Sequence, residues 1–172
     1  DMSDSVKQLK EQEDLADAMK NELTSFLGKI SKEKLTSKSS RTVTALMRIA
    51  NEIESIADCC YDLVSCMQTR YDERIQLHPT ANEEIESFAS DVTEFMQFNI
   101  ENLADADLRD TDLKTAIKLE IKIDDSRNEL RESSVNRIQE SGDVKREMIF
   151  MDIIKNFERI GDYSLNISEA VK

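Results

Sequence analysis

The feature that most constrains the fold is a row of apolar residues that recurs in alternating steps of three and four within residues 39–72. The row consists of Val43, Leu46, Ala50, Ile53, Ala57, Cys60, Val64, Met67 and Tyr71. Such steps place side chains on one face of an α-helix, because the helix turns once every 3.6 residues. With only 3 glycines and 1 proline in 172 residues, little interrupts long helices. The pattern therefore predicts an all-α protein.

The same period predicts five long helices that are joined by short connections. Polar runs, Pro79 and Gly142 mark the connections. Short connections place consecutive helices side by side in antiparallel directions. We therefore expect an elongated antiparallel helical bundle that forms a single domain over residues 1–172. Its helices are expected over residues 3–30, 39–72, 82–103, 111–140 and 144–171, with an acidic turn over residues 105–110.

The net charge of −13 disfavours some partners. A nucleic-acid-binding surface needs clustered basic residues, and the sequence has none, so no nucleic acid is expected as a partner. Repulsion from anionic headgroups also argues against direct lipid binding. The sequence has no signal peptide and no apolar run long enough to span a bilayer, so we expect this chain itself to be soluble.

The cysteines and the single histidine do not suggest a zinc site or an enzyme. Cys59, Cys60 and Cys66 contain no CxxC pair, which argues against structural zinc. Cysteine–histidine catalysis would need one of them to meet His78, which lies beside Pro79 in a helix break. The sequence also has no glycine-rich phosphate loop. Of the three cysteines, Cys60 fits the apolar row, whereas Cys59 and Cys66 fall outside it.

An internal repeat is visible in acidic segments that occur twice. In each segment a glutamate and an aspartate are one helical turn apart, and the segments match at offsets of 104 and 107 residues. The chain therefore consists of two helical repeats, residues 1–78 and 79–172. The second repeat has three helices and the first has two, so we expect the leading helix of the first repeat upstream of Asp1. The acidic pairs are Glu13/Asp17, Glu54/Asp58, Glu120/Asp124 and Glu158/Asp162.

These carboxylate pairs are candidates for binding a multivalent cation. Carboxylates at positions i and i+4 share a helix face, and they bind one hard cation together or with a matching pair on a neighbouring helix. Chance alone gives about two such pairs in a chain of this composition, whereas the sequence has five. On a helical wheel, Glu54 and Glu158 flank apolar arcs that centre near Ile53 and Phe157. This placement and the recurrence favour a metal site.

Two other interpretations of the acidic pairs stay open. The carboxylates can instead pair across the bundle with Arg48, Arg159 or a lysine. The chain is also consistent with a purely structural bundle that binds no ion. The residues alone therefore do not decide between metal binding and ion pairing.

Residues 156–163, with the sequence NFERIGDY, together with Asn166 and Ile167, resemble the signature of the PhoU family. That family is built from two three-helix repeats with an acidic E/DxxxD motif on each last helix. A weaker form of the signature lies at residues 54–58, where Ser55 and Ala57 stand in place of the usual arginine and glycine. The resemblance covers essentially the whole chain. It implies PhoU-like tandem three-helix repeats in which the first helix of repeat one is missing.

Within the family, residues 47–56 with Asp58, Cys60, Tyr61 and the pair at 70–71 resemble the cytoplasmic C-terminal PhoU-like domain of bacterial Na+/phosphate cotransporters. This resemblance implies a regulatory role in inorganic phosphate uptake at the cytoplasmic face of the bacterial inner membrane. The implied partner is a membrane-spanning transporter portion of the same chain, and a homodimer is also implied. The alternative is a free-standing, metal-binding PhoU-type regulator of phosphate transport or signalling. Neither interpretation implies an enzyme.

The family resemblance also implies which residues would bind a metal. Some members bind iron, zinc or other multivalent ions at these motifs, so iron, zinc, manganese and magnesium are the expected ions. Carried over by position, the ligands are Glu54, Asp58, Glu158 and Asp162, with Glu13, Asp17, Glu120 and Asp124 in support. If only one site binds a metal, we expect it at Glu158 and Asp162, because the first motif has drifted from the family pattern.

Overall fold

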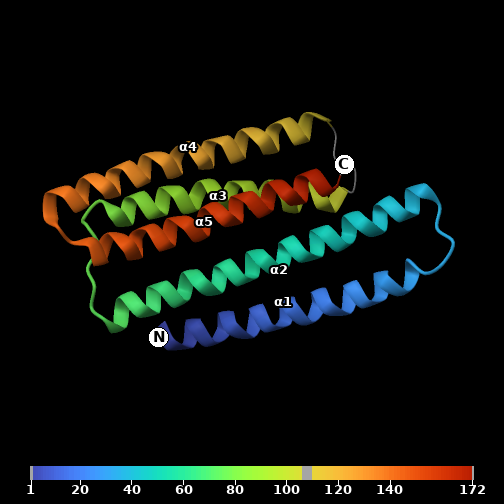
Figure 1. Ribbon diagram of the computed structural model, residues 1–172, viewed down its shortest axis with the longest axis horizontal. Helices are drawn as coiled ribbons and strands as arrows, with labels where there is room; N and C mark the ends of the chain where they lie inside the picture. The colour runs from blue at the N-terminus through green and yellow to red at the C-terminus, as the bar shows by residue number, and fades with distance from the viewer. Residues whose placement is uncertain (1, 106–109, 172) are drawn as a thin grey trace.

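The computed structural model describes residues 2–105 and 110–171, and these residues form an elongated bundle of five helices (Figure 1). The described residues contain no strand. The all-α prediction and the helical bundle are therefore confirmed. The acidic turn predicted over residues 105–110 lies largely outside the described residues. The helices are α1 (Met2–Ile30), α2 (Ser37–Asp72), α3 (Ala81–Asp105), α4 (Asp110–Ser141) and α5 (Val144–Ala170).

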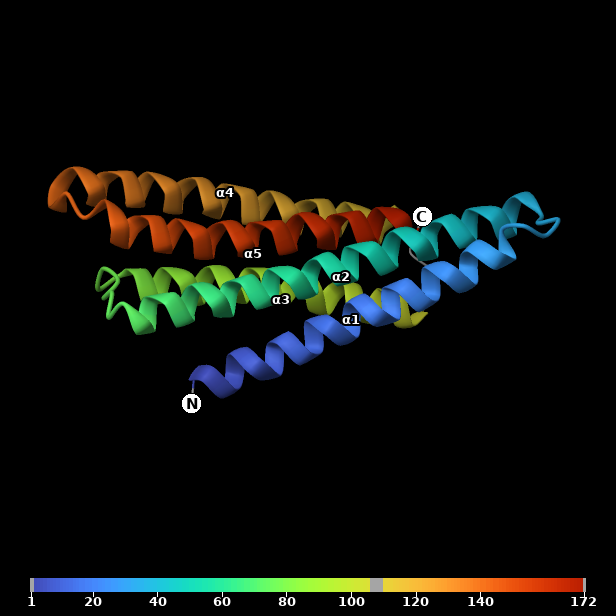
Figure 2. The same cartoon turned by 60° about the horizontal axis from the view of Figure 1, so that its bottom comes forward.

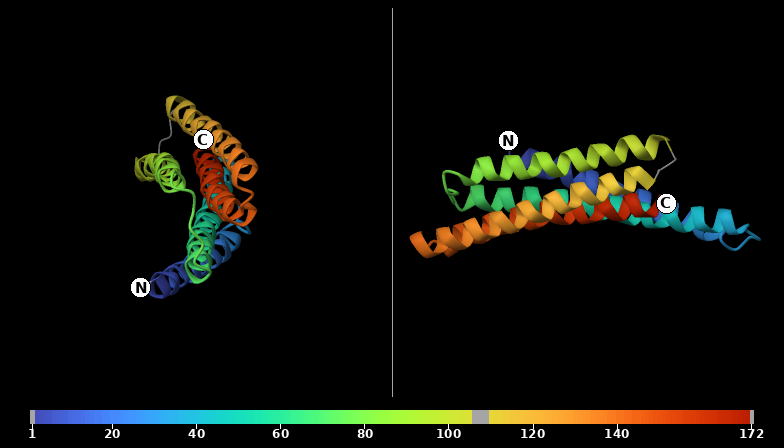
Figure 3. Two further views of the ribbon diagram at one scale, coloured as in Figure 1. Left: turned by 90° about the vertical axis from the view of Figure 1, so that its left-hand side faces the viewer. Right: turned by 90° about the horizontal axis from the view of Figure 1, so that it is seen from above.

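The helices form a curved layer with one helix on its concave side. Viewed end-on, α4, α5, α2 and α1 follow one another along an arc, and α3 lies inside the arc (Figure 3). Helix α5 packs against α2, α3 and α4, whereas α1 packs against α2 (Figures 1 and 2). Each repeat therefore contributes a helix pair to the layer, α1–α2 and α4–α5, and α5 is the helix with the most neighbours.

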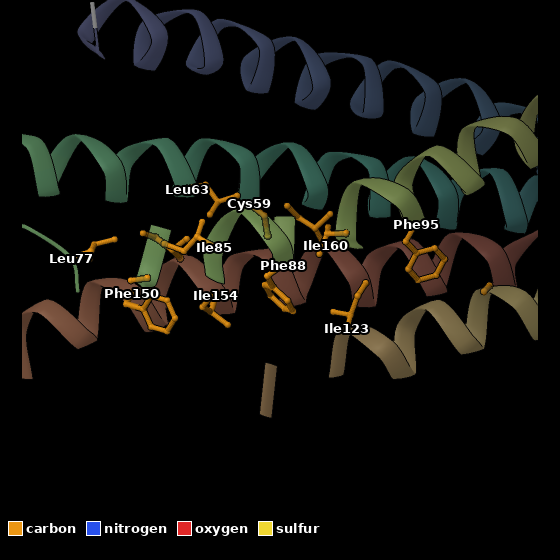
Figure 4. Packing of buried hydrophobic residues seen from close by; sticks show 14 residues of the cluster. Cys59, Leu63, Leu77, Ile85, Phe88, Phe95, Ile123, Phe150, Ile154 and Ile160 are labelled. Atoms are coloured by element: carbon orange, nitrogen blue, oxygen red, sulfur yellow. The ribbon is translucent and has the colours of Figure 1, made fainter. Parts of the chain in front are cut away.

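The hydrophobic core lies around α5. Phe150, Ile153, Ile154 and Ile160 of this helix are almost fully buried, and they meet phenylalanines of α3 (Figure 4). The ring of Phe88 contacts that of Phe157 edge to face, with centroids 6.3 Å apart. Burial of a side chain of this size stabilises the fold by about 1.5–3 kcal/mol. Helix α5 is thus held on three sides, so its polar residues are also firmly placed.

The buried surface of α2 differs from the single row that the sequence predicts. Leu46 and Ile53 of that row are 41% and 47% exposed, whereas Cys59, which falls outside the row, is fully buried. The reason is that α2 lies between α1 and α5 and buries two sides of its surface instead of one. Burial raises the pKa of the Cys59 thiol to about 11, so this cysteine stays protonated at neutral pH.

Apolar side chains remain exposed on α1. Within the described residues α1 packs only against α2, and no third helix covers this pair as α3 covers α4 and α5. The predicted leading helix of the first repeat stays a prediction. No helix in the described part of the chain combines the length and the apolar character that crossing a membrane requires. The exposed apolar residues of α1 are Leu15, Met19, Leu23 and Phe26.

A tight turn fixes α5 against α4. Gly142 has a φ of 70°, a left-handed conformation that glycine adopts at little cost. Asp143 then caps α5, because its side chain accepts a hydrogen bond of 3.2 Å from the backbone N–H of Arg146. The turn makes α4 and α5 antiparallel neighbours along their whole length (Figure 1).

A buried ion cluster joins α3, α4 and α5 near this turn. The Arg137 guanidinium donates from Nε to Glu147 at 2.9 Å and from Nη1 to Glu84 at 2.8 Å. It also lies 4.5 Å from the ring centroid of Phe150. The side chain of Glu147 is fully buried, and Arg146 contributes a second, longer contact of 3.6 Å. Sequence periodicity did not predict this cluster.

We expect Arg137→Met to destabilise the fold by about 3 kcal/mol, because it leaves the Glu147 carboxylate buried without its main partner. Arg146 keeps the cost at the low end of the range for such losses. Urea unfolding followed by circular dichroism measures the effect. Arg131→Met, at an exposed arginine of the same helix, is the matched control. The double substitution Arg137→Met with Glu147→Met should recover most of the loss, and failure of both results would contradict the account.

Candidate functional site

The acidic pairs of the second repeat are brought together by an unusually close approach of α4 and α5. A Cβ atom added at Gly161 would lie only 3.1 Å from Cδ1 of Ile123. Glycine at this position therefore lets the two backbones approach until the isoleucine packs directly on α5. Because Gly161 lies between Glu158 and Asp162 in the sequence, the close approach occurs where α5 presents its acidic pair.

The second acidic cluster consists of Glu120 and Asp124 from α4 with Glu158 and Asp162 from α5. Arg127, on α4, binds carboxylates of both helices: its Nη2 lies 3.1 Å from Asp124 and 3.5 Å from Glu158. Glu158 is half-buried and its side chain is 22% exposed, whereas Asp162 is exposed. All four predicted residues therefore lie in one neighbourhood, with an arginine among them.

Electrostatic repulsion within this cluster is visible in the acidities of its carboxyls. Partial burial, and then the charges of Asp124 and Asp162, raise the pKa of Glu120. Partial burial and the charge of Asp162 raise the pKa of Glu158, although Arg127 acts in the opposite direction. Partial burial and Asp124 likewise raise the pKa of Asp162. The single guanidinium therefore does not fully compensate the negative charge.

The first acidic cluster consists of Glu13 and Asp17 from α1 with Glu54 and Asp58 from α2. The ammonium group of Lys20, on α1, lies 2.8 Å from Asp17 and 2.8 Å from Glu54, and it thus joins the two helices. These carboxylates and Lys20 are the equivalents of those in the second cluster. Partial burial, followed by the charges of Glu54 and Glu13, raises the pKa of Asp58.

A second lysine adjoins the first cluster. Lys10 pairs with Glu13 and with Asp14, and its ammonium group lies 5.1 Å from the ring centroid of Tyr61. The first cluster therefore contains two basic side chains and the second contains one. Its negative charge is the more fully compensated of the two.

The donor set fits a hard multivalent cation, but its arrangement does not. Carboxylate oxygens from two helices are the ligands that such ions prefer. Among the described residues, however, no group of three or more histidine, cysteine, aspartate or glutamate side chains converges closely enough to hold a metal. The reason is visible in the contacts, because Lys20 and Arg127 lie where the carboxylates of paired helices would otherwise meet. The eight predicted metal ligands stay a prediction.

The basic partners of the clusters differ from the arginines that the sequence suggested. Arg48 donates to Asn166 and Glu169, and Arg159 donates to the hydroxyl of Tyr163. Neither contacts the second acidic pair. The lysine alternative holds for the first cluster, whereas Arg127 escaped sequence analysis. The offset of 107 residues that aligns the repeats would have found it, because it places Arg127 on Lys20.

Comparison with known proteins gives a consistent family. The family model described as "PhoU domain" matches residues 1–67 and 86–171. The chain is 32% identical over 130 residues to the Phosphate-specific transport system accessory protein PhoU homolog 2 of Thermotoga maritima, which is 75% of this chain and 53% of that protein. The chain thus spans about half the length of the curated relative that it matches.

A solved structure shares the fold. The crystal structure of PhoU from Pseudomonas aeruginosa superposes with a TM-score of 0.87, covering 96% of this chain and 78% of that chain. The sequence identity is 18%, so this likeness supports the helical architecture alone.

One predicted partner is wrong. The sequence predicted a membrane-spanning transporter portion of the same chain, but the curated relative is described as an accessory protein of a transport system. The resemblance to cotransporter tails misled because both kinds of protein carry the same acidic helical repeats. The predicted homodimer stays a prediction.

A pair of glycine substitutions tests the close approach of α4 and α5. Gly28→Ala should stabilise the fold by about 0.5–1 kcal/mol through helix propensity, because an added Cβ there has no atom within 4 Å. Gly161→Ala should gain nothing or lose stability, because its Cβ would press on Ile123. Chemical unfolding of both variants measures the difference. Equal stabilisation would show that the helices are not in tight contact at Gly161.

The raised acidities predict a dependence on pH. A carboxyl whose pKa is raised on folding costs stability at neutral pH, and the cost disappears as the pH falls below its ordinary pKa. Glu120→Gln should therefore raise the melting temperature at pH 7 by about 1–2 °C, and by less near pH 4. Glu132→Gln, at an exposed position of the same helix, is the control. A lower melting temperature for Glu120→Gln at pH 7 would contradict the repulsion.

Proposed function

Because the chain belongs to the PhoU family, we propose that it is an accessory regulator of inorganic phosphate uptake that acts on a separate transporter or sensor protein. The observation that carries the proposal is the family match, which spans both helical repeats. The role stated in the relative's name, an accessory protein of a phosphate-specific transport system, supports it. This is the free-standing alternative that the sequence left open.

The proposed mode of action is binding, on the cytoplasmic side of the membrane, and not catalysis. A long bundle offers extended helix faces to a partner protein, and the apolar side chains left exposed on α1 add to such a surface. The net charge of −13 favours a partner whose contact surface is basic. Regulation would then consist of docking on, or release from, the protein that moves or senses phosphate.

We also propose that the acidic clusters bind a multivalent cation such as manganese, magnesium, iron or zinc. The observations that support this are the oxygen-only donors from two helices and the uncompensated repulsion in the second cluster. A bound cation would supply positive charge between α4 and α5. The second cluster is favoured because it contains one basic side chain instead of two.

The regulatory role can be tested in the bacterium that encodes the chain. We expect deletion of its gene to change the initial rate of labelled phosphate uptake at least about two-fold, because a regulator sets transporter activity. Expression of the chain from a plasmid should restore the original rate. Uptake of labelled sulfate is the control and should not change.

Two outcomes decide against the proposal. Phosphate uptake that is unchanged by the deletion, in both phosphate-rich and phosphate-poor medium, would remove the regulatory role. An equal change in sulfate uptake would indicate a general effect on the cell. A matched variant, Glu132→Gln, should restore the rate as well as the unmodified chain does, because that side chain lies outside both clusters.

A further inference from the structure

The two basic residues in the acidic clusters occupy equivalent positions of the repeat. The offset of 107 residues was defined by the acidic and asparagine positions of α1 and α4, and it places Lys20 on Arg127 without further adjustment. The same offset relates Asp17 to Asp124, and the offset of 104 relates Glu54 to Glu158. A cation therefore recurs at the same place in both repeats, although the two residues differ chemically.

The contacts of the two residues are equivalent as well. Each binds the aspartate three positions earlier on its own helix and the glutamate of the paired helix. Lys20 reaches Asp17 and Glu54 at 2.8 Å each. Arg127 reaches Asp124 at 3.1 Å and Glu158 at 3.5 Å. The same three-residue arrangement thus bridges α1 to α2 and α4 to α5.

We propose that Lys20 and Arg127 are resident counter-cations that occupy the place of a metal ion in the two acidic clusters. Each neutralises carboxylates of two helices, so the helix pairs assemble without an ion. A metal binds a cluster only when the basic side chain moves out of it. The inference rests on the proposed metal binding only for that last step.

The contact distances rank the two clusters. The ammonium group of Lys20 is a compact charge that makes two contacts of 2.8 Å, and Lys10 adds a second positive charge nearby. Arg127 makes longer contacts, and its Nε is buried without a hydrogen-bond partner among the described residues. The second cluster is therefore held less tightly by its counter-cation. A metal enters it first.

The test compares manganese binding by the purified, metal-free chain and its variants, measured by calorimetric titration and by melting temperature. We expect Arg127→Met to bind Mn²⁺ about tenfold more tightly than the unmodified chain. Saturating Mn²⁺ should raise the melting temperature of this variant by about 3–5 °C more than that of the unmodified chain. Lys20→Met should show the same change in direction at the first cluster.

Three further variants separate the explanations. Arg127→Lys keeps the charge and should bind Mn²⁺ like the unmodified chain. Arg48→Met, which removes the ion pair with Glu169 outside both clusters, should leave Mn²⁺ binding unchanged. Glu158→Gln with Asp162→Asn, added to Arg127→Met, should abolish the gain. Circular dichroism of every variant checks that the helices are intact, and Arg127→Gln replaces Arg127→Met if the latter does not fold.

The outcomes distinguish this inference from the proposed function. If the unmodified chain binds Mn²⁺ as tightly as Arg127→Met, metal binding stands and the counter-cation role is overturned. If neither the unmodified chain nor any variant binds Mn²⁺, Mg²⁺, Zn²⁺ or Fe³⁺, the metal proposal and the displacement step both fail. Tighter binding confined to the variants that lack a basic residue supports the inference.

Discussion

The burial of α5 on three sides is the constraint on which the rest of the structure depends. Its apolar residues meet α2, α3 and α4, and the contact with α4 is close because Gly161 has no side chain to separate the helices. A helix held in this way cannot rotate, so Glu158 and Asp162 have a fixed direction towards α4. The acidic neighbourhood is thus a consequence of core packing.

Bringing four carboxylates together creates a problem of charge that both repeats solve in the same way. Each repeat places one basic side chain between the paired helices, Lys20 in the first and Arg127 in the second. The equivalence extends to the packing positions, because Ala57 and Ala16 correspond to Gly161 and Ile123 by the same offsets. One repeat combines two small residues where the other combines the smallest with a large one. The duplicated unit therefore kept its charge pattern while its packing diverged.

The helices could be predicted from the sequence because each carries a long apolar period, and the ends agree to within about two residues. The partners of individual side chains could not. Cys59 is buried because α2 has neighbours on two sides, and one row on a helical wheel does not show this. The ion cluster of Arg137 joins residues from three helices whose relative positions follow from the fold. The acidic pairs were visible, whereas their counter-cation required the neighbouring helix to be placed.

The account's central claim is that Arg127 compensates the charge of the second acidic cluster by binding Glu158. A double-mutant cycle of Arg127→Met and Glu158→Gln, measured by chemical unfolding at pH 7 without metal, tests it most directly. The account predicts a favourable coupling of about 0.5–1 kcal/mol, as expected for a partly buried pair. A coupling of zero, with additive effects of the two substitutions, would contradict it.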